Sequence, residues 1–282
     1  MSNLNEKAML VLLNVSQWTA RKYDKRATKQ VADNNQATGD VGKFNKLLIQ
    51  GDDFRRIGQI VNQARDYHYK HTLPWDNNGQ RILPIVGFDS YRQGMNGYMA
   101  DFNSAVSNFV AKYPELKNMA QRVLGSLYRA DDYPVDVAQR FNFSVELMPV
   151  PDSGDFRVAL GEDEIADISA KIECKVKSAE SKAKREIADR IHKALSHAVN
   201  KLQDVEEIFR DSLIGNIKEL SETLPLLNMD NDPVITQLAE DLRDKIGNKL
   251  PSELRNYPER RIQVANDAKA LLDDIDKRLG LA

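Results

Sequence analysis

Basic side chains close to aromatic ones are the residues in this sequence best suited to bind a ligand. The first basic group follows Trp18 and surrounds Tyr23, and its members are Arg21, Lys22, Lys25, Arg26 and Lys29. The second basic group lies in the carboxyl-terminal half, and its members are Lys171, Lys175, Lys182, Lys184, Arg185, Arg190 and Lys193. Lysine and arginine neutralise phosphates, and aromatic rings stack on bases. Both groups are therefore candidate nucleic-acid-binding residues.

The solvated faces of amphipathic helices would explain the same two groups. Acidic residues are interspersed in the second group, where Glu180–Lys184 and Glu186–Arg190 have the spacing of ion pairs within a helix. The isoelectric point of about 6.1 is far below that of a dedicated nucleic-acid-binding domain. For these residues the sequence favours solvated helix faces over a nucleic-acid interface.

Few other residues could support catalysis or bind a metal. His68 and His71 lie three apart on an expected helix and could form half a metal site, but no third ligand has a readable spacing. Cys174 has no histidine partner at a recognisable spacing, so we expect a buried or inert thiol. No nucleophile elbow or glycine-rich phosphate loop is present, and Gly94 and Gly97 are only a weak match. We expect no catalytic residue, no metal and no cofactor.

Composition limits the class of protein. The 282 residues suffice for one large domain or two ordinary ones, and 41% of them are hydrophobic. No apolar run approaches the length of a transmembrane helix, so we expect no membrane contact. The single cysteine excludes an internal disulfide and suits a reducing cytoplasm. Residues 1–160 carry a net charge of +3 and residues 161–282 a net charge of −5, which indicates two regions with different surfaces.

Strands and helices alternate in the amino-terminal half. The run Met9–Val15 is either a buried strand or the start of a helix, and residues 73–88 form either a tight hairpin or an ordered crossover. Alternation over residues 141–147 and 156–160 predicts a β-hairpin. Apolar stripes predict four helices, one from Trp18 that carries the first basic group, then residues 53–72, residues 91–112 and a separate helix opened by Pro114.

One apolar stripe dominates the carboxyl-terminal half. It runs from Ile168 to Leu224 with one apolar residue about every 3.7 positions, which predicts a continuous helix. This interval is longer than the repeat of a leucine zipper, so zipper packing is not expected. Asp232 and Pro233 form a helix start, and another helix begins near Pro258, after an irregular link. The stripe is covered either by these returning helices or by another protomer.

These elements predict a mainly α protein with a small antiparallel β element. We expect a globular α(+β) domain at residues 1–161 and a coiled-coil-like helical arm at residues 162–282.

The middle of the chain resembles an uncharacterised protein family of tailed bacteriophages, a domain of unknown function. The motifs that carry the resemblance lie within Leu73–Pro134 and are Leu73-Pro74-Trp75-Asp76, Gly79-x-Arg81-Ile82-Leu83-Pro84, Leu124-Gly125 and Asp132-Tyr133-Pro134. The resemblance implies a phage-encoded protein in the host cytoplasm and an AAA ATPase of the MoxR type as a partner. It transfers no catalytic residue.

Two functional hypotheses follow. The leading one is a non-enzymatic interaction or assembly protein that self-associates into a homo-oligomer and binds partners through the helical arm. The alternative is a protein that binds single- or double-stranded nucleic acid through the two basic groups.

Overall fold

The chain folds into long helices and a small antiparallel sheet, as the sequence predicts. The computed structural model describes residues 4–39, 41–76, 78–154 and 161–279. Within these residues, none of the helices combines the length and the apolar content that crossing a membrane requires.

The chain divides into two compact units that are discontinuous in sequence. Unit 1 comprises Met1–Leu12, His68–Arg92 and Glu146–Ala282. Unit 2 comprises Leu13–Tyr67 and Gln93–Val145. The sequence-based division after residue 161 follows the order of the chain, whereas these units are assembled from segments far apart in it.

The sheet has the strand order β4-β5-β1-β6. Strand β1 (Ala8–Ser16) pairs antiparallel with β5 (Arg81–Pro84), and β5 pairs with β4 (Leu73–Pro74). The Met9–Val15 run is therefore a strand, and residues 73–84 form a hairpin. Strand β6 (Asn142–Pro149) is the first half of the hairpin expected at residues 141–160. The second half, at 156–160, lies outside the described residues.

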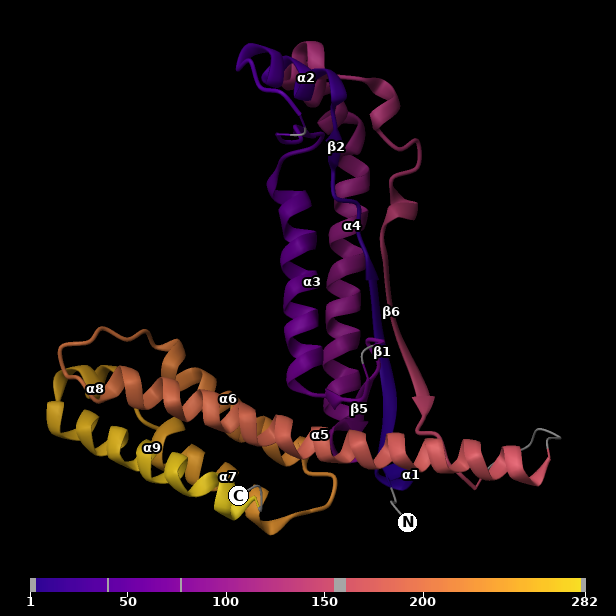
Figure 1. Cartoon of the computed structure of the whole chain (residues 1–282). Coiled ribbons are helices and arrows are strands. Elements are labelled where there is room, and N and C mark those ends of the chain that lie inside the picture. Colours follow the sequence, from indigo (N-terminus) through magenta and orange to yellow (C-terminus); the bar gives the residue numbers. More distant parts are fainter. Residues whose placement is uncertain (1–3, 40, 77, 155–160, 280–282) are drawn as a thin grey trace. The chain divides into compact units, whose positions relative to one another are not determined.

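Unit 2 is built around two long helices, α3 (Asp52–Lys70) and α4 (Phe88–Leu124), which lie side by side in Figure 1. Aromatic rings fill its core, and the rings of Phe54 and Phe109 pack there with their centroids 5.4 Å apart. The sequence predicts two helices here, separated before Pro114. That prediction is wrong, because Pro114 lies inside a continuous helix.

Core packing of the residue before Pro114 explains this continuity. Proline removes one hydrogen bond of the helix ladder. The preceding residue, Tyr113, is buried against Trp18 and Phe109, and its hydroxyl donates to the Pro134 carbonyl oxygen at 3.1 Å. These contacts hold the chain in helical form across the missing bond.

Gly94 belongs to the packing of unit 2 and not to a phosphate loop. It faces Tyr67 of α3, and a Cβ atom at this position would lie 2.3 Å from the tyrosine ring. Glycine is thus required for the close approach of the two helices.

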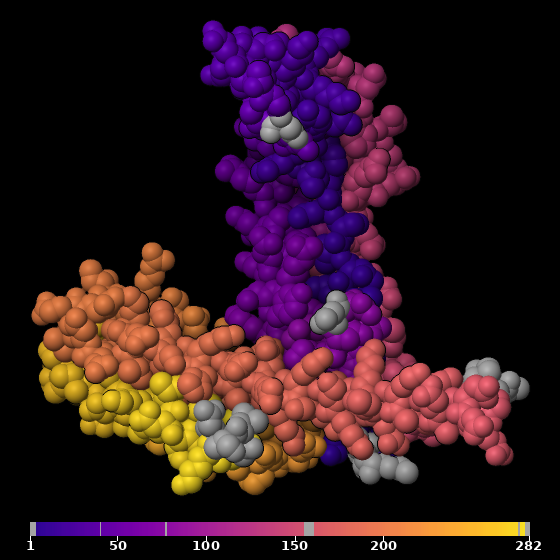
Figure 2. Space-filling view, in the orientation of Figure 1, coloured from indigo at the N-terminus to yellow at the C-terminus, as the bar shows by residue number. Residues whose placement is uncertain are grey.

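Unit 1 contains the long helix, α5 (Glu162–Leu202), which is followed by α6 (Ser212–Leu227). Figures 1 and 2 show α9 (Pro258–Arg278), in yellow, lying along α5. Between residues 176 and 202 the stripe of α5 is buried, and it belongs to one core cluster with residues of α6 and α9. The stripe is therefore covered by returning helices of the same chain.

The continuous helix predicted from Ile168 to Leu224 is wrong, because α5 ends at Leu202. The last carbonyls of a helix have no partner within it. Here Arg261 of α9, which is only 4% exposed, donates to the carbonyl oxygens of Lys201 at 2.7 Å and Val205 at 2.9 Å. It also donates to the carbonyls of Leu202, Asp204 and Glu207. One buried guanidinium thus stabilises the turn between α5 and α6.

The remaining elements are short or cap the longer ones. Residues between Pro251 and Pro258 were expected to be irregular, but they form the short helix α8 (Pro251–Asn256). Asp232 caps α7 as predicted, and its side chain accepts from Val234 N at 2.8 Å. The other bounds are α1 Leu4–Lys7, β2 Arg21–Tyr23, α2 Lys25–Asn34, β3 Asn45–Leu47, η1 Ile85–Gly87, η2 Gly125–Leu127, η3 Ala130–Asp132, η4 Ala138–Arg140, α7 Pro233–Leu242 and the π-helical η5 Arg243–Gly247.

We predict that Arg261→Met lowers the free energy of unfolding by about 3 kcal/mol or more, because it leaves buried carbonyls unpaired. Urea unfolding followed by circular dichroism measures this change. The matched control is Arg260→Met, since the neighbouring arginine is exposed and its contacts with the Glu253 carboxylate and the Tyr257 ring lie at the surface. The control should cost less than about 1 kcal/mol. Equal losses in the two variants would contradict the role assigned to Arg261.

Candidate functional site

The second basic group lies on α5, and much of its charge is neutralised within unit 1. Lys171 pairs with Asp167 at 2.6 Å and Lys184 with Asp230 at 3.9 Å. Lys175 pairs with Asp76 at 3.1 Å, and its ammonium lies 5.3 Å from the centroid of the Trp75 ring. Among the described residues, the members that are exposed and form no ion pair are Lys182, Arg185 and Lys193.

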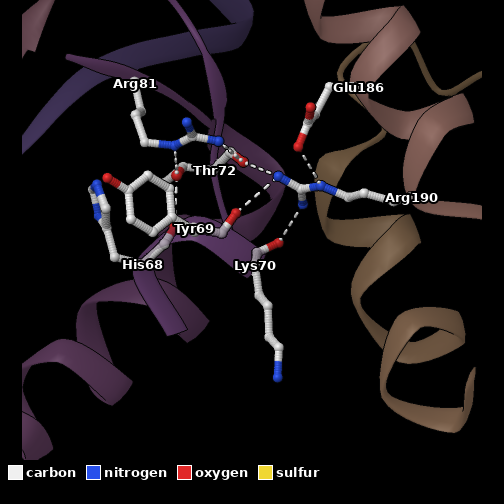
Figure 3. A network of polar contacts seen from close by, with 7 residues as sticks. All are labelled: His68, Tyr69, Lys70, Thr72, Arg81, Glu186 and Arg190. Atoms are coloured by element: carbon white, nitrogen blue, oxygen red, sulfur yellow. Dashed lines mark hydrogen bonds and ion pairs between the residues drawn. The ribbon is translucent and has the colours of Figure 1, made fainter. Parts of the chain in front are cut away.

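Arg190 of this group binds the backbone (Figure 3). Its guanidinium donates to the carbonyl oxygens of Tyr69, Lys70 and Thr72, each at 2.8 Å. Glu186, one turn earlier on α5, pairs with it at 3.0 Å. The arginine therefore caps the carboxyl-terminal end of α3, and its donors are engaged within the chain, while its role in phosphate binding stays a prediction.

Arg81 binds the same turn from the sheet. Its Nε donates to the Thr72 hydroxyl at 2.7 Å, and that hydroxyl donates to the His68 carbonyl oxygen at 2.6 Å. The Arg81 guanidinium also lies 4.7 Å from the centroid of the Tyr69 ring. Two arginines and a threonine together satisfy the carbonyls that α3 leaves free, and they make this turn a structural centre of unit 1.

His68 is a buried core residue. It is 3% exposed, and its Nδ1 lies 2.8 Å from the Tyr91 hydroxyl. Burial, with a smaller contribution from the charge of Arg81, lowers the pKa of His68 to about 4. Across the described part of the chain, no group of three or more His, Cys, Asp and Glu side chains could hold a metal ion.

Cys174 is exposed on α5, so of the expected buried or inert thiol the buried alternative is wrong and the inert one stays a prediction.

The first basic group lies in unit 2, and only part of it is helical. The sequence predicts one basic helix from Trp18, but Arg21 and Lys22 belong to strand β2, and α2 begins at Lys25. The prediction fails because Ala20 adopts a left-handed φ of 51° and its carbonyl accepts from Leu48 N at 2.7 Å. The segment thereby joins a two-stranded ribbon with β3 and does not continue as a helix.

All members of the first basic group are exposed. No ion pair is found for any of them among the described residues. In the second basic group, by contrast, Lys171, Lys175, Lys184 and Arg190 all have acidic partners. The five residues of the first basic group, the strip at residues 21–29, thus all keep their charge available to a ligand, whereas in the second basic group only Lys182, Arg185 and Lys193 do so among the described residues.

A buried lysine positions this strip. Lys46 of β3 is 3% exposed, and its ammonium lies 3.1 Å from Asp24 Oδ2 and 2.7 Å from Asp132 Oδ2. It also donates to the Leu127 carbonyl oxygen at 2.7 Å. Burial alone would lower the pKa of Lys46, but hydrogen bonds and charges from Asp132 and Asp24 outweigh it and raise the pKa. The cation therefore stays charged at neutral pH.

Asp24 connects the buried lysine to the exposed cations. Its Oδ1 accepts from the backbone N–H of Ala27 at 3.1 Å and of Arg26 at 3.0 Å, which caps α2. The hydrogen bond from Ala27, and next the one from Lys46, lower the pKa of Asp24. One carboxylate thus fixes the start of α2, which carries Lys25, Arg26 and Lys29, at the end of β2.

An open groove lies beside the strip within unit 2. Its volume is about 600 Å³, and Trp18, Arg21, Lys22 and Arg140 are among its lining residues, together with the carboxylate of Asp131. Trp18 is half-buried, because its ring packs on Phe54, Phe109 and Tyr113 of the core. Three cations and an indole ring can bind an anionic ligand that also has an aromatic part.

The division into units separates charge more sharply than the division at residue 161. Unit 2 contains 15 Lys+Arg and 11 Asp+Glu, a net charge of +4. Unit 1 contains 25 Lys+Arg and 31 Asp+Glu, a net charge of −6. The isoelectric point of the whole chain therefore conceals a basic unit.

Sequence reasoning missed Arg140, Lys46 and Asp132 as parts of this site. Arg140 and Asp132 lie more than 100 positions from Lys22 in the chain, so no spacing rule connects them. For Lys46 the sequence did contain a signal of burial, because the apolar residues Leu47, Leu48 and Ile49 follow it directly.

We predict that His68 makes stability depend on pH. Its native pKa of about 4 lies below the value of 6.5 for an unperturbed histidine, so the unfolded chain takes up the proton first as pH falls. The stabilisation is complete above pH 6.5 and declines by up to about 3 kcal/mol towards pH 4. Urea unfolding at a series of pH values should show a shallower decline for His68→Gln. Parallel curves for the two proteins would refute this assignment.

Comparison of the chain with protein-family models, with curated proteins and with solved structures finds no match to any of them. Function is therefore inferred from the geometry within each of the two units.

Proposed function

We propose that this protein is a non-enzymatic nucleic-acid-binding protein and that unit 2 carries its binding surface. The observation that supports this most directly is the strip of five basic residues at 21–29, all exposed and without an ion pair among the described residues. An interface with nucleic acid draws its affinity from such free cations, because each neutralised phosphate releases a counterion.

The contrast between the two basic groups supports the same choice. A charge run that serves only solubility can be paired with acids on its own helix, as Arg190 is with Glu186. The strip at 21–29 includes one acid, Asp24, and that carboxylate is directed to the buried Lys46 and to the start of α2. The Asp24 carboxylate is thus bound inside unit 2, whereas the basic side chains of the strip remain exposed to solvent.

We predict that the protein binds a single-stranded oligonucleotide in a mobility-shift assay and that its affinity falls steeply as salt is added. Replacing Arg21, Lys22 and Lys25 by Gln should lower the affinity and reduce the slope of log K against log salt by about 2, since three phosphate contacts are lost. The matched control replaces Lys182, Arg185 and Lys193 by Gln, which removes the same charges from α5. The control should leave the slope unchanged. An absence of any shift at low salt, with the single strand and with a duplex of the same length, would eliminate the proposal.

Self-association remains a second proposal, now with a different surface. Because the stripe of α5 is buried by its own chain, the arm no longer offers it to a second protomer. Unit 2 instead exposes two apolar residues one turn apart on α4, Met119 at 56% and Val123 at 73%. Exposed apolar neighbours of this kind favour association with another protein surface.

We predict that replacing Met119 and Val123 by Ser abolishes any concentration-dependent oligomer seen by sedimentation velocity. Ile208 in unit 1 is 89% exposed and provides the control, Ile208→Ser, which should leave the oligomer intact. A monomer at all concentrations in the unchanged protein would remove this proposal.

The resemblance over Leu73–Pro134 supports a proposal about context. We propose on this basis that the protein acts in the cytoplasm of a phage-infected bacterium, with an AAA ATPase of the MoxR type as a partner. Purified ATPase and the full chain, mixed and separated by gel filtration, should co-elute if this partnership exists.

A further inference from the structure

We infer that the nucleic acid is single-stranded and that the β2–β3 ribbon is the platform on which one of its bases stacks. This inference rests on the proposed function and specifies the ligand of the same surface. It is drawn from the register of the ribbon, the exposure of its residues and the groove beside it.

The register sorts the ribbon residues onto two faces. Arg21 is opposite Leu47, and Tyr23 is opposite Asn45, whereas Lys22 is opposite Lys46. Side chains alternate between the faces of a strand, so the first two pairs share one face. Lys46 on the other face is buried, and it fixes the ribbon to the body of unit 2. The face formed by Arg21, Tyr23, Asn45 and Leu47 is the outward one.

The outward face is apolar at its centre and basic around it. Tyr23 is 41% exposed and Leu47 is also 41% exposed, although neither lies in a loop. Arg21 precedes the tyrosine on the same face, and Lys25 and Arg26 follow it at the start of α2. An uncovered phenol ring between cations matches what an unpaired nucleotide presents, a flat base joined to phosphates.

One residue of the outward face, Arg21, also lines the groove. Arg21 and Lys22 line it, together with Arg140 and the half-buried ring of Trp18. A strand whose base stacks on Tyr23 would therefore meet cations for its phosphates and a second ring close by in the chain. Aromatic rings interleaved with cations along a groove are typical of single-strand binding.

Two features argue against a duplex as the ligand. Stacking on Tyr23 or Trp18 requires a free base face, which a base pair inside a helix does not offer. The groove also contains the exposed carboxylate of Asp131, which would repel the dense phosphate array of a duplex. A flexible single strand can direct its phosphates to the cations and away from that acid.

Tryptophan fluorescence provides a direct test. The chain has two tryptophans, so Trp75→Phe in the buried core of unit 1 leaves Trp18 as the reporter. We expect a single-stranded oligothymidylate to quench this fluorescence and a duplex of equal length to compete at least tenfold more weakly. Tyr23→Leu keeps apolar bulk but removes the ring, and it should weaken single-strand binding about tenfold. Tyr257→Leu, at a tyrosine of unit 1 that is 48% exposed, is the control and should bind normally.

Each outcome separates this inference from the proposed function. Equal or tighter binding of the duplex would overturn the single-stranded assignment and leave nucleic-acid binding intact. Unchanged affinity in Tyr23→Leu would overturn the stacking platform in the same way. If neither nucleic acid binds at low salt, by fluorescence or by mobility shift, the proposed function itself falls. Tyr23→Phe, which retains the ring, should bind as the unchanged protein does.

Discussion

Arginine bound to the free carbonyls of helix ends is the interaction on which unit 1 depends. Arg190 binds the last turn of α3, and Arg261 binds the last turn of α5. Neither helix ends in the glycine that most often satisfies such carbonyls. A guanidinium suits this task, because its five donors are rigid and its charge persists when buried. These bonds tie elements that are distant in the chain, since Arg261 and Lys201 lie on different helices.

Unit 2 solves the corresponding problem with a lysine. The ammonium of Lys46 holds Asp24, Asp132 and the Leu127 carbonyl, and so fixes the ribbon and the start of α2 together. Buried cations with full sets of partners thus organise both units. The exposed basic residues at 21–29 therefore keep their charge for a ligand, because the neighbouring Asp24 carboxylate is already bound to Lys46 and to the start of α2. This is why the strip at 21–29, and not the longer run on α5, is the better candidate interface.

The sequence was informative where local chemistry decides structure. The Asp232–Pro233 helix start and the apolar stripe of α5 were readable, whereas the apolar run of β1 could not be told apart from the start of a helix. It was misleading where a distant residue decides. The break after Leu202 depends on Arg261, and the helix across Pro114 depends on aromatic packing with Trp18. Of the candidate site, the basic residues were readable, but their sorting into paired and free ones required the fold.

The discontinuity of unit 1 has a consequence for biosynthesis. A ribosome makes the chain from its amino terminus, and every segment of unit 2 has emerged once Val145 is outside the exit tunnel. Unit 1 cannot close at that stage, because its first and second segments await α5 and the helices after it. The ribbon and its strip are therefore complete while β4 and β5 still lack their helical cover. During this interval apolar side chains such as Leu73 and Ile82 are open to chaperones, a vulnerability that the finished protein does not display.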